Sequence, residues 1–186
     1  IFEPGMTSAQ LDVLFADVKS WLPDLLNKVV AKQSQQSLIA PVGPFPTAVQ
    51  RELGLETMAQ LGFDFTAGRL DISAHPFCGG VPEDVRITTR YDENELLSAL
   101  FGVIHETGHA RYEQNLPRSW SGQPIALARS TAIHESQSLF FEMQLGRSKA
   151  FLMRLIPAVT RHFGNQAAFE ESNFIAWNQQ VKPGFI

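Results

Sequence analysis

Residues 92–115 read DENELLSALFGVIHETGHARYEQN, a stretch that predicts one long helix in the second half of the chain. Asp92 is a suitable N-cap, and Glu95 can reach back to it. Apolar side chains recur at helical spacing and form the stripe that faces the core: Leu96, Leu97, Leu100, Phe101 and Ile104. We therefore expect a helix that runs from Asp92 to about Asn115.

Inside this helix, residues 105–109 read HETGH. At 3.6 residues per turn, His105 and His109 lie one turn apart on the same face, where two imidazoles can bind one divalent ion. Glu106 is offset around the helix and is placed to take a proton from a metal-bound water, whose pKa the ion lowers towards about 7. Two incidental histidines on an ordinary helix are the alternative, and a third ligand discriminates between the two interpretations.

The residues around the histidine pair restrict the third ligand. A metzincin needs Gly at position 112 and His at position 115, but the chain has Tyr112 and Asn115, which excludes that class. A glutamate from a second helix is the other common solution. Glu135 follows a loop that contains Leu116-Pro117 and Gly122-Gln123-Pro124, so its helix can return antiparallel to the first and face the pair.

Composition limits the class of protein. The chain has 186 residues, of which 44% are hydrophobic, so it is long and apolar enough for one domain with a sizeable core. Its formal net charge of −4 gives no basic footprint for nucleic acid. A single cysteine, Cys78, excludes an internal disulfide and favours a reducing, cytoplasmic location. No apolar run predicts a membrane span, and no leader predicts secretion.

The rest of the chain is mostly helical by pattern. Thr7 and Gln10 form a capping box for a first helix that Pro23 should kink or split, and residues 33–46 form a loop. Thr47 and Gln50 repeat the capping device. Further helices are expected at residues 47–60, 124–145, 147–163 and 165–181.

A small sheet of about three strands is expected in the middle of the chain. Residues 63–65 and 70–72 alternate apolar and polar side chains around Ala67-Gly68 and predict a hairpin. Residues 84–90 predict a third strand, and residues 75–80 an irregular turn. The predicted fold class is therefore mainly α with a small sheet.

Four motifs occur together, in the order HPF (75–77), DVRIT (84–88), HETGH (105–109) and HES (134–136). In order and spacing they resemble the motifs of the Taq-type metallocarboxypeptidases, peptidase family M32, over nearly the whole chain. The resemblance implies a helical, zincin-type metallopeptidase core with the small sheet beside a metal cleft. It also implies removal of single residues from peptides with a free C-terminus, and a homodimer.

By the same resemblance, His105, His109 and Glu135 match the metal ligands and Glu106 the general base. One divalent ion is expected, with zinc favoured over cobalt. His75 is expected to line the cleft, although a loop histidine bonded to backbone is the alternative. Arg86 either binds the substrate carboxylate or covers the wet face of an edge strand.

Three other residues lie near the site in the sequence pattern. Glu142 is interpreted as a solvated carboxylate rather than a residue that supports the site. His134 either orients Glu135 or packs, and Cys78 is either inert or reactive towards thiol reagents.

Family chains are more than twice as long as this one. We therefore expect residues 1–186 to form a single catalytic-core segment from the middle of a longer enzyme. Two other functions stay open: a related zinc oligopeptidase or endopeptidase with the same ligands, and a metal-binding helical fragment without activity.

Overall fold

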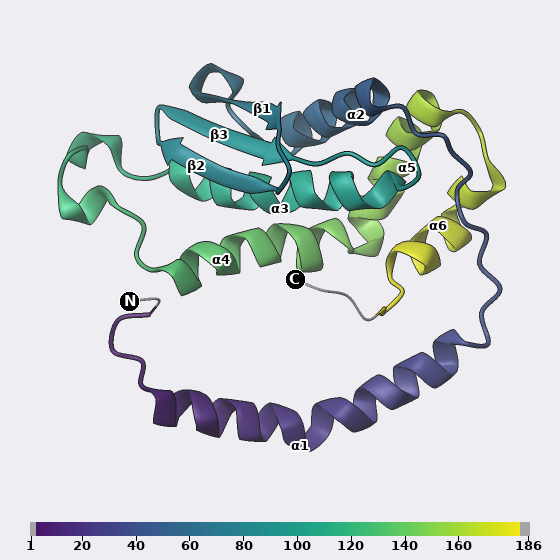
Figure 1. Cartoon of the computed structure of the whole chain (residues 1–186), viewed down its shortest axis with the longest axis horizontal. Coiled ribbons are helices and arrows are strands. Elements are labelled where there is room, and N and C mark those ends of the chain that lie inside the picture. The colour runs from purple at the N-terminus through teal and green to yellow at the C-terminus, as the bar shows by residue number, and fades with distance from the viewer. Residues whose placement is uncertain (1–2, 183–186) are drawn as a thin grey trace.

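Helix α3 (Leu96–Gln114) runs through the middle of the molecule in a computed structural model that describes residues 3–182. The sheet lies along one side of α3, and helix α4 (Thr131–Leu139) lies along the other (Figure 1). Eleven of the 19 residues of α3 are buried. A helix covered on two sides needs apolar residues around much of its circumference, which explains why the buried residues of α3 are not confined to a single stripe.

The start of α3 differs from the predicted cap. The helix begins at Leu96 after Glu95, which makes no side-chain cap. Asp92 instead turns the preceding loop, because its Oδ1 accepts a hydrogen bond from the backbone N–H of Asn94 at 2.8 Å. This local turn competes with helix capping for the same carboxylate. The prediction that Asp92 and Glu95 form the cap was therefore wrong.

The sheet has three strands, as expected, and two of them contain predicted strand segments, residues 70–72 and 84–89, but the third lies elsewhere than predicted. β1 (Gly68–Ile72), β2 (Phe77–Val81) and β3 (Asp84–Thr89) pair in the order β1-β3-β2. β1 runs parallel to β3, and β2 runs antiparallel to it, with Cys78 opposite Ile87. Since β3 is central, its alternate residues Val85, Ile87 and Thr89 are buried against α3.

The predicted hairpin at residues 63–72 was wrong. Asp64 Oδ1 accepts hydrogen bonds from the backbone N–H and the hydroxyl of Thr66, which starts a short 3-10 turn, η1 (Phe65–Ala67), in place of a strand. The predicted turn at residues 75–80 was also wrong, because β2 occupies most of it. Gly80 has φ +119°, and a Cβ there would lie 2.1 Å from the Asp84 carbonyl oxygen. Its glycine therefore serves a tight β2–β3 connection rather than an irregular loop.

Three further helices gather near the N-terminal end of α3: α2 (Thr47–Gln60), α5 (Lys149–Phe163) and α6 (Glu171–Asn178) (Figure 1). α2 begins at Thr47 after Pro46 without a side-chain cap, so the capping box predicted there was wrong. Gln50 is buried instead, and its amide donates hydrogen bonds to the carbonyls of Phe45 and Asp92. The predicted helix at residues 165–181 is shorter, because η5 (Ala167–Phe169) precedes α6.

Helix α1 (Ser8–Gln33) stands apart from the other helices (Figure 1). The capping box of Thr7 and Gln10 is present, and the helix bends but continues through Pro23 rather than splitting. None of its residues is buried, and Phe15 and Trp21 are among its exposed side chains. Within residues 3–182, no helix is both long and apolar enough to cross a bilayer.

The helix predicted at residues 124–145 has three parts. Pro124 begins a single 3-10 turn, η3 (Pro124–Ala126), and α4 starts only after Ser130, whose side chain accepts from the N–H of Ile133. From Phe140 to Gly146 the helix widens into a π-helical segment, η4. Such segments are rare and occur frequently at functional sites.

Candidate metal centre

The site depends on an unusually close approach of α3 and α4 at Gly108. A Cβ at this position would lie 2.6 Å from Ser138 Cα and 2.8 Å from the carbonyl oxygen of Gln137. Only glycine therefore allows the two helices to pack at this separation. The contact brings Glu135, one turn before Ser138 on α4, to the histidine face of α3.

Three donor side chains converge there, and they are the three predicted ones. Glu135 Oε1 lies 3.5 Å from His105 Nε2, and Glu135 Oε2 lies 3.2 Å from His109 Nε2. One atom from each residue lies within 4.8 Å of the others. Bonds of about 2.0–2.1 Å around a tetrahedral ion separate neighbouring ligand atoms by about 3.3 Å, so the spacing fits one such ion.

His105 is held from behind by the π-helical segment. Its Nδ1 lies 3.0 Å from Glu142 Oε2, which leaves Nε2 to face Glu135. Arg147 Nη2 in turn lies 3.5 Å from the other oxygen of Glu142. The interpretation of Glu142 as a solvated carboxylate was therefore wrong, since its side chain is only 21% exposed and contacts a candidate ligand.

His109 is held from behind by Glu113 and by His134, which contacts His109 where the sequence left open whether it orients Glu135 or packs. Its Nδ1 lies 2.6 Å from Nδ1 of His134, and His134 Nε2 lies 2.7 Å from Glu113 Oε1. Glu113 lies four residues after His109, hence on the same face of α3. That spacing is a signal in the sequence that points to Glu113.

Glu106 is buried, 6% exposed, and lines a cavity of about 580 Å³ together with Pro76, Gly102 and His105. Burial raises its pKa to about 7; the charge of His105 opposes the rise and that of Glu135 adds to it. A carboxyl with a pKa near neutrality is suited to accept and release a proton.

The electrostatics of the histidines also fit a cation site. Burial lowers the pKa of His109 to about 4, and charge repulsion from His134 and His105 acts in the same direction. The low pKa favours the neutral imidazole, which is the form that binds metals. Burial opposes charge on His105 too, but the hydrogen bond with Glu142 and the charges of Glu106 and Glu135 outweigh it and raise the pKa of His105. The same negative charge attracts a cation.

The predicted substrate-binding residues lie outside this cluster. His75 is exposed, and its carbonyl accepts a hydrogen bond from the Thr88 hydroxyl, while the neighbouring Pro76 lines the cavity. Arg86 lies on the exposed face of β3, a central rather than an edge strand, and forms an ion pair with Asp84 at 2.7 Å. Substrate contacts by His75 and Arg86 stay predictions.

Cys78 packs against the cluster of buried side chains beneath the sheet. Burial raises the pKa of its thiol to about 12, and the charges of Glu106 and Glu113 act in the same direction. A thiol held in its protonated form is a poor nucleophile, which favours the inert interpretation.

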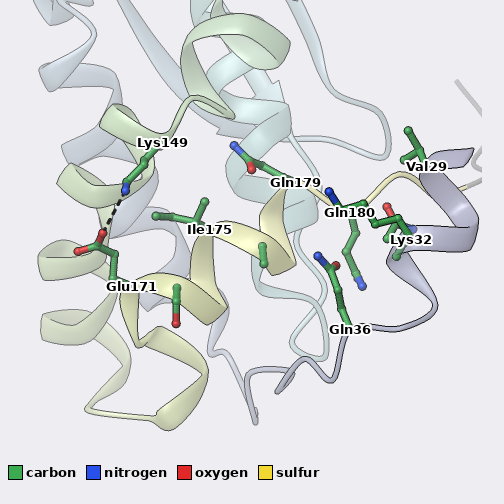
Figure 2. A pocket seen from close by; sticks show the side chains of 11 residues that line it. Val29, Lys32, Gln36, Lys149, Glu171, Ile175, Gln179 and Gln180 are labelled. Carbon is green, nitrogen blue, oxygen red and sulfur yellow. Dashed lines mark ion pairs between the residues drawn. The ribbon is translucent and has the colours of Figure 1, made fainter. Parts of the chain in front are cut away.

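Two further cavities help to locate the chemistry. One of about 470 Å³ adjoins the opposite end of the cluster and is lined by His109, Arg129 and Glu135, among others. Another, of about 410 Å³, lies between α1 and α6, and its lining includes four glutamines and the Lys149–Glu171 ion pair (Figure 2). Within residues 3–182, the His105, His109 and Glu135 cluster is the one group with metal-binding spacing, and it lies outside that third cavity.

Two histidines one turn apart, a glutamate from a facing helix and a small sheet beside them define a helical, zincin-type metallopeptidase core. The sequence model of the carboxypeptidase Taq (M32) metallopeptidase family matches residues 1–186. The chain belongs to this family. Membership implies a divalent metal ion, for which the donor set described above is suited.

Individual relatives agree with this assignment. The chain is 45% identical to carboxypeptidase 1 of Bacillus subtilis and 39% identical to thermostable carboxypeptidase 1 of Thermus thermophilus, and all of it is covered in both cases. The solved structure of Trypanosoma cruzi metallocarboxypeptidase 1 matches 98% of the chain with 52% identity and a TM-score of 0.95. The chain spans 36–38% of the length of these three proteins.

Proposed function

We propose that this chain provides the metal centre of a metal-dependent carboxypeptidase, which hydrolyses single residues from the C-termini of peptides. The observation that carries the proposal is the convergence of His105 Nε2, His109 Nε2 and the Glu135 carboxylate in a chain of this family. We further propose that residues 1–186 form a single catalytic-core segment.

Zinc is the proposed ion. Two imidazoles and one carboxylate are a donor set used by catalytic zinc sites, in which three protein ligands leave a fourth position open. When bound, the ion polarises the scissile carbonyl and acidifies water. The proposed roles of His105, His109 and Glu135 are to hold it.

Glu106 is the proposed general base. Its carboxylate accepts a proton from the attacking water and delivers that proton to the leaving amine, which its pKa of about 7 allows at neutral pH. The side chain is buried beside the cavity that Pro76 and Gly102 line, so it adjoins the space that a substrate would occupy.

Space for a peptide is available on both sides of the cluster. The cavity beside Glu106 and the one beside Arg129 adjoin His105 and His109 respectively. A substrate that lies across the cluster therefore occupies both. His75 and Arg86 are kept as predicted substrate-binding residues. To bind the substrate carboxylate, Arg86 would have to give up its ion pair with Asp84.

Peptides with free and amidated C-termini test the substrate class. The full chain, loaded with zinc, should hydrolyse the free peptide, and amidation of the same peptide should abolish release of its last residue. Equal hydrolysis of the two peptides would exclude a carboxypeptidase and favour an oligopeptidase or endopeptidase. Stoichiometric zinc without hydrolysis of either peptide would favour an inactive metal-binding fragment.

The assembly and location of the protein are also proposals. The family resemblance favours a homodimer, and the single cysteine of the chain favours the cytoplasm. Sedimentation of the full chain tests the first.

A further inference from the structure

His134 and Glu113 form a chain of contacts that ends on one candidate ligand. His134 Nδ1 lies 2.6 Å from His109 Nδ1, and His134 Nε2 lies 2.7 Å from Glu113 Oε1. The three side chains are 15–22% exposed, so water competes little for these contacts. The Tyr112 ring packs edge-on against His134, with ring centroids 5.1 Å apart, and restricts its rotation.

The proton positions in this chain follow from its last member. The Glu113 carboxylate only accepts hydrogen bonds, so His134 carries its hydrogen on Nε2. In neutral His134, Nδ1 is then an acceptor. Two facing Nδ1 atoms need one hydrogen between them, and it must therefore belong to His109.

The consequence reaches the metal-binding atom. A neutral His109 with its hydrogen on Nδ1 has a lone pair on Nε2, the atom that faces Glu135 at 3.2 Å. The opposite arrangement, with hydrogen on Nδ1 of His134, would require His109 to accept at Nδ1. His109 would then carry its hydrogen on Nε2 and could not bind a metal ion there.

We propose that His134 and Glu113 are positioning residues that hold His109 in the tautomer whose Nε2 binds the metal ion. This rests on the proposed metal centre. Glu142 serves His105 directly with a carboxylate, whereas His109 is served by a carboxylate through a second imidazole. Removal of partners behind a ligating histidine typically weakens metal binding about 10–100-fold.

The test compares Glu113→Leu with Glu113→Gln in the full chain, because the glutamine oxygen can still accept from His134. Glu83→Leu removes an exposed carboxylate elsewhere and is the matched control. Zinc affinity is measured by chelator competition, and long-range ¹H–¹⁵N spectra show which ring nitrogens of His134 and His109 carry hydrogen. Glu113→Leu should weaken zinc binding about 10–100-fold and remove the Nε2–H preference of His134. Glu113→Gln should keep that preference and bind zinc more tightly than Glu113→Leu, and Glu83→Leu should behave as wild type.

Wild-type zinc affinity in Glu113→Leu, or a His134 tautomer that this substitution leaves unchanged, would overturn the inference. If Glu113→Leu does not fold, His134→Asn and His134→Leu replace it. The asparagine oxygen can occupy the place of Nδ1 and accept a hydrogen bond from His109, whereas leucine cannot. Zinc should therefore bind His134→Asn more tightly than His134→Leu. Equal zinc affinities of these two variants would overturn the inference. A wild-type chain that binds no zinc would instead remove the proposed metal centre.

Discussion

Single residues behind the candidate ligands distinguish this site from two histidines on an ordinary helix. An imidazole offers one nitrogen to a metal ion, and the hydrogen bond at its other nitrogen selects which one. Glu142 occupies that position for His105, and His134 occupies it for His109. Both histidines consequently present Nε2 to Glu135.

Replacement of Glu142 tests this arrangement at His105. Glu142→Leu keeps a similar volume but removes the acceptor for His105 Nδ1–H, so zinc affinity should fall about 10–100-fold. Chelator competition in the full chain measures it. Glu83→Leu, which removes an exposed carboxylate, should bind zinc as wild type does, and an unchanged affinity in Glu142→Leu would refute the role of Glu142.

The sequence identified the three converging side chains, because helical spacing pairs the two histidines and motif order adds Glu135. It did not identify what stands behind the histidines. Glu142 reaches His105 only because α3 and α4 touch at Gly108, and the separation of two helices is not encoded in the periodicity of either. His134 was left open for the same reason.

At the scale of elements, Gly108 sets the distance between α3 and α4. Gly108→Ala would place a Cβ 2.6 Å from Ser138 Cα, so the helices must separate, at a cost of about 1–3 kcal/mol in unfolding free energy. Gly102→Ala is the matched control in the same helix, since its Cβ would lie 3.6 Å from Thr89 Oγ1. That variant should be neutral or more stable by about 0.5–1 kcal/mol. Denaturant unfolding measures both, and equal stabilities would contradict the close approach.

Glu56 joins α2 to α5 by ion pairs with Arg161 and with His162, whose Nε2 lies 3.0 Å away. The hydrogen bond from Arg161, and then that from His162, lowers the pKa of Glu56 from its ordinary value of 4.5. A lowered folded-state pKa contributes stability above pH 4.5, and this contribution is lost as the pH falls through the lowered value.

Glu56→Gln should therefore destabilise the chain at pH 7 by about 0.5–1 kcal/mol, a small effect because the pair with Arg161 is largely exposed. The difference from wild type should shrink below pH 4.5 in denaturant titrations at several pH values. Glu52→Gln is the control, since Glu52 lies 3.9 Å from His162 and is 68% exposed, and it should show little change. A pH-independent difference for Glu56→Gln would argue against the ion pairs.

The elements themselves were predictable where side-chain periodicity is strong. The buried stripe of α3 and the alternation of β3 indicated both correctly, within a few residues at their ends. β2 was missed because Pro76, Gly79 and Gly80 are typical of turns, whereas its stability comes from backbone pairing with β3. The π-helical widening at Phe140 has no local signal, because it depends on packing against α3.

At the scale of the whole molecule, α3 is the axis that the sheet covers on one side and that α4 and the π-helical segment cover on the other (Figure 1). The converging side chains lie between two cavities, which together offer space for a peptide that crosses the site. Family membership followed from the order of four motifs, and the overall fold class followed from the side-chain patterns. The exposure of α1, none of whose residues is buried, was not predicted, because periodicity within a helix does not show whether another element covers it.

The central claim is that this geometry serves hydrolysis with Glu106 as the base. Its most direct test is Glu106→Gln in the full chain, with zinc content and turnover of a peptide with a free C-terminus measured on the same sample. Glu106→Gln should keep wild-type zinc content and reduce turnover by about 10²–10⁴-fold, because the amide cannot accept the proton of the attacking water. Wild-type turnover in this variant would contradict the role of Glu106 as the base.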